Sequence, residues 1–288
     1  MHRAAGTDRP RLVAISGRTQ LIAHLGWPTE AFKAPLIYNP WFASQSIDAT
    51  VVPMGVEAAD YPAVLRAVFA IRNVTGALVT MPHKVTTMGL VDRVSVTAQV
   101  AGAANAVRRG PGNTLEADMF DGTGFVRGML GRGVVAARAR ALVVGAGGVG
   151  SAIAASLAGA GVAALTLHDR DPATAGALAA RLARHYPALH VAVGGPDPAG
   201  HGIVVNATPL GMQAHDPLPL DPARLDPGCF VGEVVMAQTH TPLLRAALDR
   251  GCTVQVGTDM LYEMIPAYLT FFGYGTATAA QLRAVSGV

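Results

Sequence analysis

Six consecutive residues near the middle of the chain have the types and spacing of a phosphate-binding loop, the pattern G-x-G-x-x-G. They are Gly145, Ala146, Gly147, Gly148, Val149 and Gly150. In such a loop the first glycine permits a tight turn, the second lets a pyrophosphate approach the backbone, and the third lets helix and strand pack closely. The free amides and the positive dipole end of a helix N-terminus then bind the phosphates. The expected chemistry is the binding of a dinucleotide.

The segments on both sides of this loop support the same interpretation. An apolar strand over Ala141–Val144 precedes the loop and a helix over Val149–Ala158 follows it, which is the context that a glycine pattern needs to be informative. A second strand over Ala164–His168 leads to Asp169, nineteen residues beyond Gly150. A carboxylate is expected there to bind the ribose hydroxyls.

Asp169 and Arg170 bear on the choice of cofactor. Asp169 favours NAD, because a carboxylate accepts a hydrogen bond from the ribose 2′-hydroxyl and repels a 2′-phosphate. Arg170 is able to bind that phosphate through its guanidinium fork, so NADP stays open. The sequence predicts NAD or NADP as the cofactor, with NAD favoured.

The same stretch has a second interpretation as a membrane span. Ala141–Leu167 is a run of 27 residues without a charged side chain, which is long enough to cross a bilayer. Its apolar content is mostly alanine and valine rather than the Leu, Ile and Phe that drive membrane insertion, and glycines divide it into short pieces. We therefore expect a buried strand, helix and strand, and no membrane partner.

The composition excludes several classes of protein. Of 288 residues, 51% are hydrophobic and 14% are charged, which excludes intrinsic disorder. The 22 Lys and Arg residues are scattered and the net charge is +3, so nucleic acid is not expected as a partner. Cys229 and Cys252 match neither a disulfide framework nor a metal cluster, and no metal is predicted. Met1–Pro10 lacks the apolar core of a signal peptide, so the cytoplasm is the expected location.

Alternating strand and helix patterns determine the expected fold class. Candidate strands are Leu12–Ser16, Thr50–Met54, Gly76–Met81, Ala141–Val144, Ala164–His168, His190–Val193, Ile203–Asn206, Phe230–Val235 and Thr253–Val256. Candidate helices are Tyr61–Val74, Gly122–Gly131, Val149–Ala158, Ala173–Tyr186, Pro242–Arg250 and Leu261–Phe272, and Arg108–Gly112 is a candidate hairpin turn. Such alternation predicts an α/β fold of parallel sheets with helices on both faces.

Two domains are predicted. The first is an α/β domain over residues 1–121, and the second is a doubly wound Rossmann dinucleotide-binding domain over residues 122–258. The helical residues 259–288 are expected to return to the first domain. The sequence leaves open whether the protein forms a homodimer.

A dehydrogenase also needs a group that moves the alcohol proton while hydride passes to nicotinamide. Upstream of the glycine loop, three polar segments follow one another at Thr80–Lys84, Gly102–Asn105 and Asp118–Gly122. Together with Val205–Met212 downstream, they resemble the shikimate dehydrogenase family, whose patterns V-T-x-P-x-K, G-A-x-N and D-G occur in this order. Thr241–Leu244 and Gly257–Leu261 match further family segments, so the resemblance covers most of the chain.

This resemblance implies an activity and a set of residues, and it makes residues 1–121 the substrate-binding domain. The reaction would be reversible hydride transfer between NAD(P) and a secondary alcohol of a cyclic hydroxy acid such as shikimate or quinate. Lys84 would exchange the hydroxyl proton and Asp121 would orient and polarise it, while Thr80 and Asn105 would bind the substrate. The positions implied beside the cofactor are Asn206, Ala207, Thr208, Gly211, Met212 and, near the nicotinamide, Gly257. His83 is interpreted as a structural neighbour rather than a catalyst.

The substrate-binding positions depart from the family pattern. The family's S-x-S-P, whose serines would bind a substrate carboxylate, has no good counterpart, and Gly26 and Ala34 stand where hydroxyls are expected. Leu78 stands in place of Asn and Met264 in place of Gln, and Met119-Phe120 replace Asn-Thr before the aspartate.

These changes remove hydrogen-bond partners from the implied substrate site. An unpaired buried hydroxyl or carboxylate costs roughly 1–3 kcal/mol, so we expect the chemistry to be kept for a less hydroxylated cyclic alcohol or ketone. Tyr38, Lys33 or His24 would then supply a new contact to a carboxylate. A catalytically silent nucleotide-binding regulator is the alternative, and retention of both Lys84 and Asp121 speaks against it. A folate-type dehydrogenase on the same two-domain plan is disfavoured by Val205–Met212.

Overall fold

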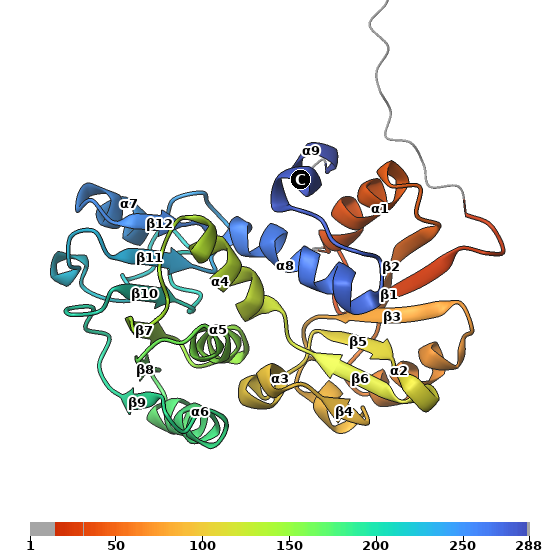
Figure 1. The fold of residues 1–288 in the computed structure, drawn as a ribbon, viewed down its shortest axis with the longest axis horizontal. Coiled ribbons are helices and arrows are strands. Elements are labelled where there is room, and N and C mark those ends of the chain that lie inside the picture. Colours follow the sequence, from red (N-terminus) through yellow and green to blue (C-terminus); the bar gives the residue numbers. More distant parts are fainter. Residues whose placement is uncertain (1–14, 31, 287–288) are drawn as a thin grey trace, which may run out of the picture.

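Two six-stranded sheets, connected by helices, make up the structure (Figure 1). The computed structural model describes residues 15–30 and 32–286. The first sheet is built from the N-terminal part of the chain and lies on the right of Figure 1, and the second follows it on the left. This two-part α/β arrangement confirms the expected fold class.

The first sheet is mixed, with strand order β2-β1-β3-β5-β6-β4. Its strands are β1 (Gln20–Gly26), β2 (Ala49–Gly55), β3 (Val74–Val79), β4 (Arg93–Val94), β5 (Ala106–Arg109) and β6 (Leu115–Asp118), and its helices are α1 (Ala34–Ser44), α2 (Tyr61–Ala70) and α3 (Val96–Ala101). Strand β5 runs antiparallel to both β3 and β6, so the expectation of a fully parallel sheet is wrong here. Between β5 and β6 the short connection over residues 110–114 allows a hairpin but no crossover, as the predicted turn at Arg108–Gly112 indicated.

The second sheet is entirely parallel, with strand order β12-β11-β10-β7-β8-β9. Its strands are β7 (Arg140–Val144), β8 (Ala164–His168), β9 (His190–Val193), β10 (Ile203–Asn206), β11 (Phe230–Glu233) and β12 (Thr253–Gln255), and its helices are α5 (Gly148–Gly159), α6 (Pro172–His185) and α7 (Pro242–Asp249). Counted along the chain, this is the 3-2-1-4-5-6 order of dinucleotide-binding folds, whose ligands bind where the order reverses. That point lies between β7 and β10.

Three further helices join the two sheets: α4 (Asp121–Gly131), α8 (Gly257–Phe272) and α9 (Ala279–Val285). Helix α4 packs against both α5 and α8. Side chains of α8 and α9 share one apolar cluster with β1 and α1, in which Tyr268 and Leu282 pack near Ile22 and Tyr38. The C-terminal helices therefore return to the first sheet, as expected.

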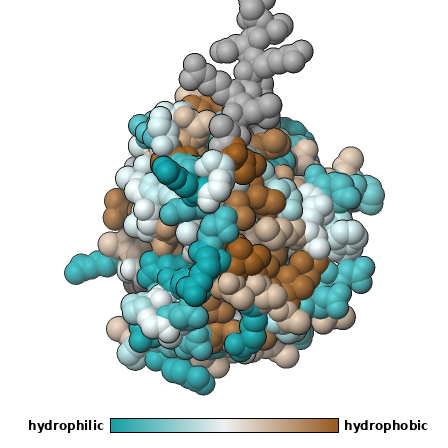
Figure 2. Space-filling model, turned by 90° about the vertical axis from the view of Figure 1, so that its right-hand side faces the viewer, coloured by the Kyte–Doolittle hydropathy of each residue, from teal (hydrophilic) through white to brown (hydrophobic). Residues whose placement is uncertain are grey.

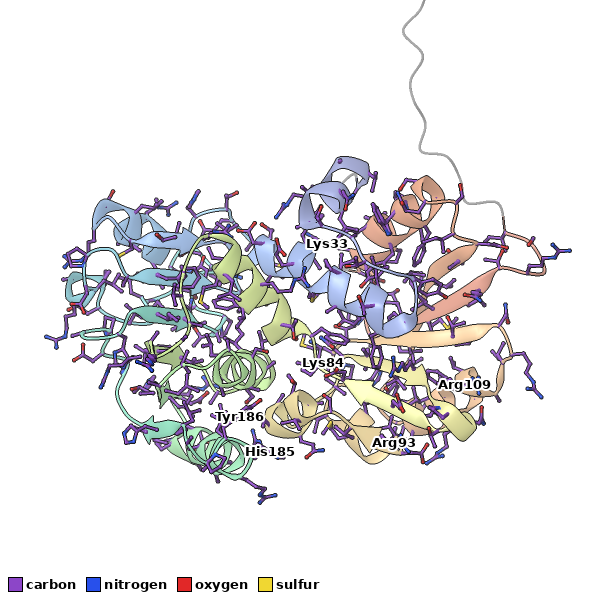
Figure 3. All side chains as sticks on the ribbon, viewed as in Figure 1. Lys33, Lys84, Arg93, Arg109, His185 and Tyr186 are labelled. Carbon is purple, nitrogen blue, oxygen red and sulfur yellow. The ribbon has the colours of Figure 1, made fainter. Side chains whose placement is uncertain are left out.

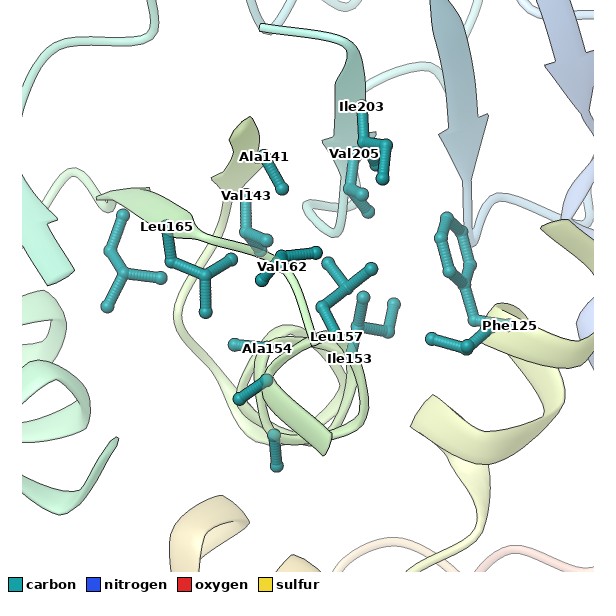
Figure 4. Packing of buried hydrophobic residues seen from close by; sticks show 14 of the residues in the cluster. Phe125, Ala141, Val143, Ile153, Ala154, Leu157, Val162, Leu165, Ile203 and Val205 are labelled. Carbon is teal, nitrogen blue, oxygen red and sulfur yellow. The ribbon is translucent and has the colours of Figure 1, made fainter. Parts of the chain in front are cut away.

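The uncharged run Ala141–Leu167 forms β7, α5 and most of β8 rather than a membrane span. Figure 4 shows Val143, Ile153 and Leu165 in the shared interior of these elements. Ala141–Val144 of β7 are all buried, as are Leu165 and Leu167 of β8, which explains the absence of charge there. Among the described residues, no helix is long and apolar enough to cross a membrane.

Apolar side chains also remain on the surface. Trp27 is 50% exposed, Leu36 57% and Met81 74%. Figure 2 views the outer end of the first sheet, where hydrophobic residues form a band between hydrophilic ones. Exposed single apolar residues are common in folded proteins, so the 51% hydrophobic content is shared between interior and surface.

Two predicted elements near the N-terminus are wrong. The first strand is Gln20–Gly26, not Leu12–Ser16; residues 12–14 lie outside the described part, and Ile15 and Ser16 are not in a strand. The helix expected over Tyr61–Val74 ends at Ala70, because Val74 begins β3.

Helix α4 approaches its neighbours through glycines. An ideal Cβ at Gly122 would lie 2.0 Å from the carbonyl oxygen of Ala152 in α5, and one at Gly124 would lie 2.5 Å from that of Met260 in α8. Since these contacts are with backbone atoms, a side chain at either position would force the helices apart.

Gly122→Ala is therefore expected to lower Tm by several degrees, because overpacking a helix contact costs about 1–3 kcal/mol. Gly131→Ala is the matched control: it lies at the end of the same helix, and its Cβ would meet nothing within 4 Å. Thermal unfolding followed by circular dichroism compares the two. Equal Tm values for Gly122→Ala and Gly131→Ala would contradict the close α4–α5 contact.

Candidate active site

One cavity of about 290 Å³ contains all six residues predicted for catalysis and substrate binding. They are Tyr38, Thr80, Lys84, Asn105, Asp121 and Met264. Figure 3 labels Lys84 near the junction of the two halves of the molecule, and Lys33, which also lines the cavity, at that junction too. The sequence motifs thus converge on one site.

The centre of the cavity is an ion pair between Lys84 and Asp121. Lys84 Nζ donates to Asp121 Oδ2 at 2.7 Å, and Asn105 Nδ2 donates to Asp121 Oδ1 at 2.7 Å. The Phe120 amide donates to Asn105 Oδ1 at 2.9 Å, which fixes the orientation of the amide. Asp121 is 4% exposed and begins α4, where the positive end of the helix dipole stabilises a carboxylate. The carboxylate and the ammonium are therefore held in fixed positions.

The mixed sheet explains why these three side chains meet. Lys84 follows the carboxyl end of β3, Asn105 precedes the amino end of β5, and Asp121 follows the carboxyl end of β6. Because β5 runs antiparallel to both neighbours, its amino end lies at the same sheet edge as the carboxyl ends of β3 and β6. His83, by contrast, is buried, contacts the Val56 carbonyl oxygen at 2.8 Å and stacks on Tyr61, which agrees with a structural role.

Helix α8 supplies a wall of the cavity that sequence analysis found only in part. Leu261, Met264, Ile265 and Tyr268 all line the cavity, and only Met264 was predicted. Their spacing of three, four and seven residues places them on one helix face. That periodicity in Leu261–Phe272 was the available signal for the other three. Phe32 and Met236, which also line the cavity, carried no such signal.

Only some of the departures from the family pattern lie in the cavity. Ala34, Leu78 and Met264 line it, as expected. Met119 is instead fully buried in the core, and Phe120 packs against the rings of Tyr268 and Phe271, so their expected effect on the substrate site is not supported. At Gly26 a Cβ would lie 2.4 Å from Thr80 Cγ2, and this close approach gives the glycine a packing role.

A second cavity of about 330 Å³ lies at the point where the strand order reverses. The predicted cofactor residues that line it are Gly145, Gly147, Asp169, Arg170, Ala207 and Thr208. Position 145 has φ +100°, a conformation that only glycine adopts readily. A Cβ at Gly147 or Gly148 would meet nothing within 4 Å, so the space above the loop is open for a pyrophosphate. These residues fit a dinucleotide.

Side-chain hydrogen bonds hold the two loops of this cavity. Asp169 Oδ2 accepts from the Ala146 amide at 2.7 Å, which joins the end of β8 to the glycine loop. Asn206 Oδ1 accepts from Thr208 Oγ1 at 2.6 Å, and Asn206 Nδ2 donates to the Leu210 carbonyl oxygen at 3.0 Å. Asn206 therefore shapes the loop whose Ala207 and Thr208 face the cavity.

The remaining cofactor predictions lie outside the lining of this cavity. Gly148, Val149 and Gly150 form the first turn of α5 beneath the loop. Gly211 and Met212 lie further along the β10 loop, with Met212 50% exposed. A Cβ at Gly257 would lie 2.2 Å from the Val235 carbonyl oxygen, so this glycine has a packing reason at the start of α8. The roles of Gly211, Met212 and Gly257 stay predictions.

Comparison with known proteins agrees with this geometry. Residues 25–107 match the model of the shikimate dehydrogenase substrate binding domain, and residues 134–179, around β7, α5 and β8, match the ThiF family. Shikimate dehydrogenase (NADP(+)) of Acidiphilium cryptum is 37% identical over 90% of this chain and 92% of its own length. The chain belongs to the shikimate dehydrogenase family. The corresponding enzyme of Rubrobacter xylanophilus is 35% identical over 95% of this chain and 98% of its own.

Solved structures extend the family comparison. Quinate dehydrogenase from Corynebacterium glutamicum in complex with NAD is 28% identical, with a TM-score of 0.84 over 93% of this chain and 98% of its own. A 5-ketofructose reductase of Gluconobacter is 25% identical, with a TM-score of 0.85 over 94% of this chain and 98% of its own. As a family member with Lys84 and Asp121 in place, the chain is an oxidoreductase that uses NAD or NADP on a CH–OH group. The silent regulatory alternative is not supported.

Proposed function

We propose that the protein interconverts a secondary alcohol and a ketone on a cyclic hydroxy acid: shikimate, quinate or a less hydroxylated relative. The observation that carries this proposal is the Lys84–Asp121 ion pair, with 2.7 Å between Nζ and Oδ2. The pair lies in the cavity that Met236 also lines, and Met236 follows β11 of the second sheet. Relatives named for shikimate and quinate support the substrate class.

In this mechanism the reacting oxygen of the substrate lies against Lys84 and Asp121. When bound, the nicotinamide supplies or accepts the hydride. In the reducing direction the Lys84 ammonium donates a proton to the carbonyl oxygen, and in the oxidising direction the neutral amine takes up the hydroxyl proton. Asp121 holds Lys84 Nζ through one carboxylate oxygen, and Asn105 holds the other. Thr80 and Asn105 would contact the substrate beside this pair.

The cavity lining also favours NAD over NADP. Asp169 lines the cofactor cavity, and Asp171 follows it after Arg170. Hydrogen bonds from Thr174 and from the Ala173 amide lower the pKa of Asp171, so it is anionic at neutral pH. A 2′-phosphate would face the Asp169 carboxylate, with a second carboxylate beyond Arg170, whereas a 2′-hydroxyl would donate to Asp169.

Asp169→Asn tests this preference. The amide oxygen keeps an acceptor for the Ala146 amide, while the charge and the acceptor of the Asp171 amide are lost. With the charge removed, the ratio of kcat/KM with NADP to that with NAD should rise about tenfold or more. Asp249→Asn, which removes an exposed carboxylate at the end of α7, is the charge-matched control and should leave the ratio unchanged. A wild-type enzyme that already prefers NADP would overturn the assignment.

The function itself is tested with a panel of cyclic hydroxy acids and both cofactors. Absorbance of the reduced cofactor should rise with at least one acid, and more with NAD than with NADP. Absence of turnover with every acid, for a protein that binds the cofactor, would restore the regulatory alternative.

Three structural expectations belong to the same proposal. Residues 1–121 and 259–288, which include the first sheet, would form the substrate-binding domain. Residues 122–258 would form the dinucleotide-binding domain. A homodimer and a cytoplasmic location also stay predictions. Light scattering would report the oligomeric state.

A further inference from the structure

The chain contains two lysines, Lys33 and Lys84, and both line the substrate cavity; every other residue among its 22 Lys and Arg is an arginine. A lysine is a compact point charge, whereas arginine is a planar fork. Lys84 is paired with Asp121. Lys33 forms no ion pair among the described residues, and its side chain is exposed. The cavity therefore carries one cation without an anionic partner.

Tyr38 also lines this cavity, and its hydroxyl has no hydrogen-bond partner among the described residues. Its side chain is 1% exposed, and its OH is sealed from solvent without a hydrogen bond. Burial raises the pKa of Tyr38 well above its usual value, so the hydroxyl stays protonated and is able to donate. A buried hydroxyl left unpaired is unfavourable, and an oxygen of a bound ligand would satisfy it.

His24 supplies a further donor. Burial, and then the charge of Lys84, lower the pKa of His24 to about 4, so the ring is neutral at pH 7. Nδ1 is buried and has no hydrogen-bond partner in the described part of the chain, and the ring stacks on Phe32 with 4.0 Å between centroids. An unpaired ring nitrogen is less unfavourable without its proton, which places the proton on Nε2. His24 is 8% exposed and lines the cavity, so its Nε2–H is the donor that it has for a bound ligand.

Helix α1 begins beside these groups. Lys33 is its N-cap residue and Ala34 its first residue; the helix has no side-chain cap and no acidic residue in its first turn. The positive end of its dipole therefore lies beside the cavity that Lys33, Tyr38 and His24 line.

Much of the remaining lining is apolar. Leu78, Met236, Leu261, Met264 and Ile265 line the cavity, and none of these side chains carries a group that donates or accepts a strong hydrogen bond. A ring hydroxyl pressed against this surface would be left unpaired, which lowers affinity by roughly tenfold or more. Outside the reacting position, the lining therefore suits hydrocarbon.

We infer that Lys33, Tyr38 and His24 form a carboxylate subsite, and that the substrate is a cyclic monocarboxylic acid with one reacting hydroxyl or keto group on an otherwise hydrocarbon ring. The subsite replaces the missing serines with a cation and two neutral donors. The statement about the reacting group rests on the proposed function, whereas the carboxylate subsite is testable without catalysis.

Binding is tested with cyclohexanecarboxylate, which has no hydroxyl to oxidise, and with cyclohexanecarboxamide, its uncharged match. In full-length protein labelled with ¹³C at the lysine Cε, two lysine signals are expected, and Lys33→Arg assigns them. The carboxylate should shift the Lys33 signal to saturation, and the amide should not. Equal shifts with acid and amide, or binding that leaves the Lys33 signal unmoved, would overturn the subsite.

Calorimetry on variants identifies the donors. Lys33→Ala and Tyr38→Phe should each weaken cyclohexanecarboxylate binding about fivefold or more. Tyr61→Phe is the matched control, since Tyr61 is buried and contacts Thr87 Oγ1 at 2.7 Å outside the cavity, and it should leave the Kd unchanged. Unchanged binding in both Lys33→Ala and Tyr38→Phe would contradict the assignment.

Turnover separates this inference from the proposed function. The kcat/KM for 3-hydroxycyclohexane-1-carboxylate should exceed that for shikimate tenfold or more, and its methyl ester should lose efficiency through KM rather than kcat. A tenfold preference for shikimate, or an ester as efficient as the acid, would refute the inference while the dehydrogenase stands. If cyclohexanecarboxylate binds through Lys33 and Tyr38 but no alcohol is oxidised, the proposed function fails and the subsite stands.

Discussion

Replacing Lys84 with methionine is expected to lower kcat roughly 10²–10⁴-fold, the usual contribution of a positioned acid or base. Lys84 Nζ is the cation bonded to Asp121 Oδ2 in the substrate cavity, and methionine keeps all but the last atom of the side chain's length, without a proton to exchange. Lys84 does not line the cofactor cavity, so the Kd for NAD should stay within about twofold of wild type. Steady-state kinetics and calorimetry measure the two quantities.

A double variant separates this catalytic loss from damage to the fold. Lys84→Met alone leaves Asp121, 4% exposed, without its cation, and an uncompensated buried charge is destabilising. Lys84→Met with Asp121→Asn removes both charges and should recover Tm without recovering kcat. A single Lys84→Met enzyme that turns over within threefold of wild type would exclude Lys84 from proton transfer.

The second sheet was predicted from sequence to within two residues at each strand end. Its central strands are buried on both faces, so runs such as Ile203–Val205 are continuously apolar and contrast with the helices between them. The glycine pattern and the carboxylate after β8 then identified the cofactor cavity. Hydrophobic pattern and turn chemistry indicate the same structure in this half of the chain.

The first sheet was predicted less well because tertiary packing determines its elements. Strand β1 contains Gln20 and His24, which obscure its apolar character. Helix α1 contains Pro35 and Pro40 and has no clear helical periodicity, yet Tyr38 and Phe42 are buried against α8 and α9. That packing involves residues more than 200 positions away in the sequence, which no local pattern reports.

In the candidate site, too, local motifs were predictable from sequence and tertiary contacts were not. Lys84, Asn105 and Asp121 lie in short motifs, so sequence found them, whereas their meeting depends on the antiparallel direction of β5. Leu261 and Tyr268 contribute to the cavity only because α8 returns to the first sheet. The hydrogen-bonding state of Tyr38 and His24 is a property of burial, and it becomes visible only when the whole cavity is assembled.

Gly150→Ala is expected to weaken NAD binding about 10–100-fold and to lower Tm by several degrees. A Cβ at this position would lie 1.9 Å from the Gly145 carbonyl oxygen and 3.2 Å from Ala207 Cβ. The loop, the start of α5 and the β10 loop would all have to move, because the nearest contact is with backbone. Calorimetry with NAD and thermal unfolding without it report the two effects.

Two further glycines separate packing from phosphate approach. Gly147 has φ −68°, and its Cβ would meet nothing within 4 Å, so Gly147→Ala should keep the cofactor-free Tm and still weaken NAD binding, since its methyl group would enter the space that a pyrophosphate needs. Gly159→Ala, at the far end of α5 with its nearest contact 3.6 Å away, should change neither quantity. If Gly150→Ala and Gly147→Ala lowered Tm equally, the distinct packing role of Gly150 would be refuted; if Gly147→Ala bound NAD like wild type, the pyrophosphate would not lie over this loop.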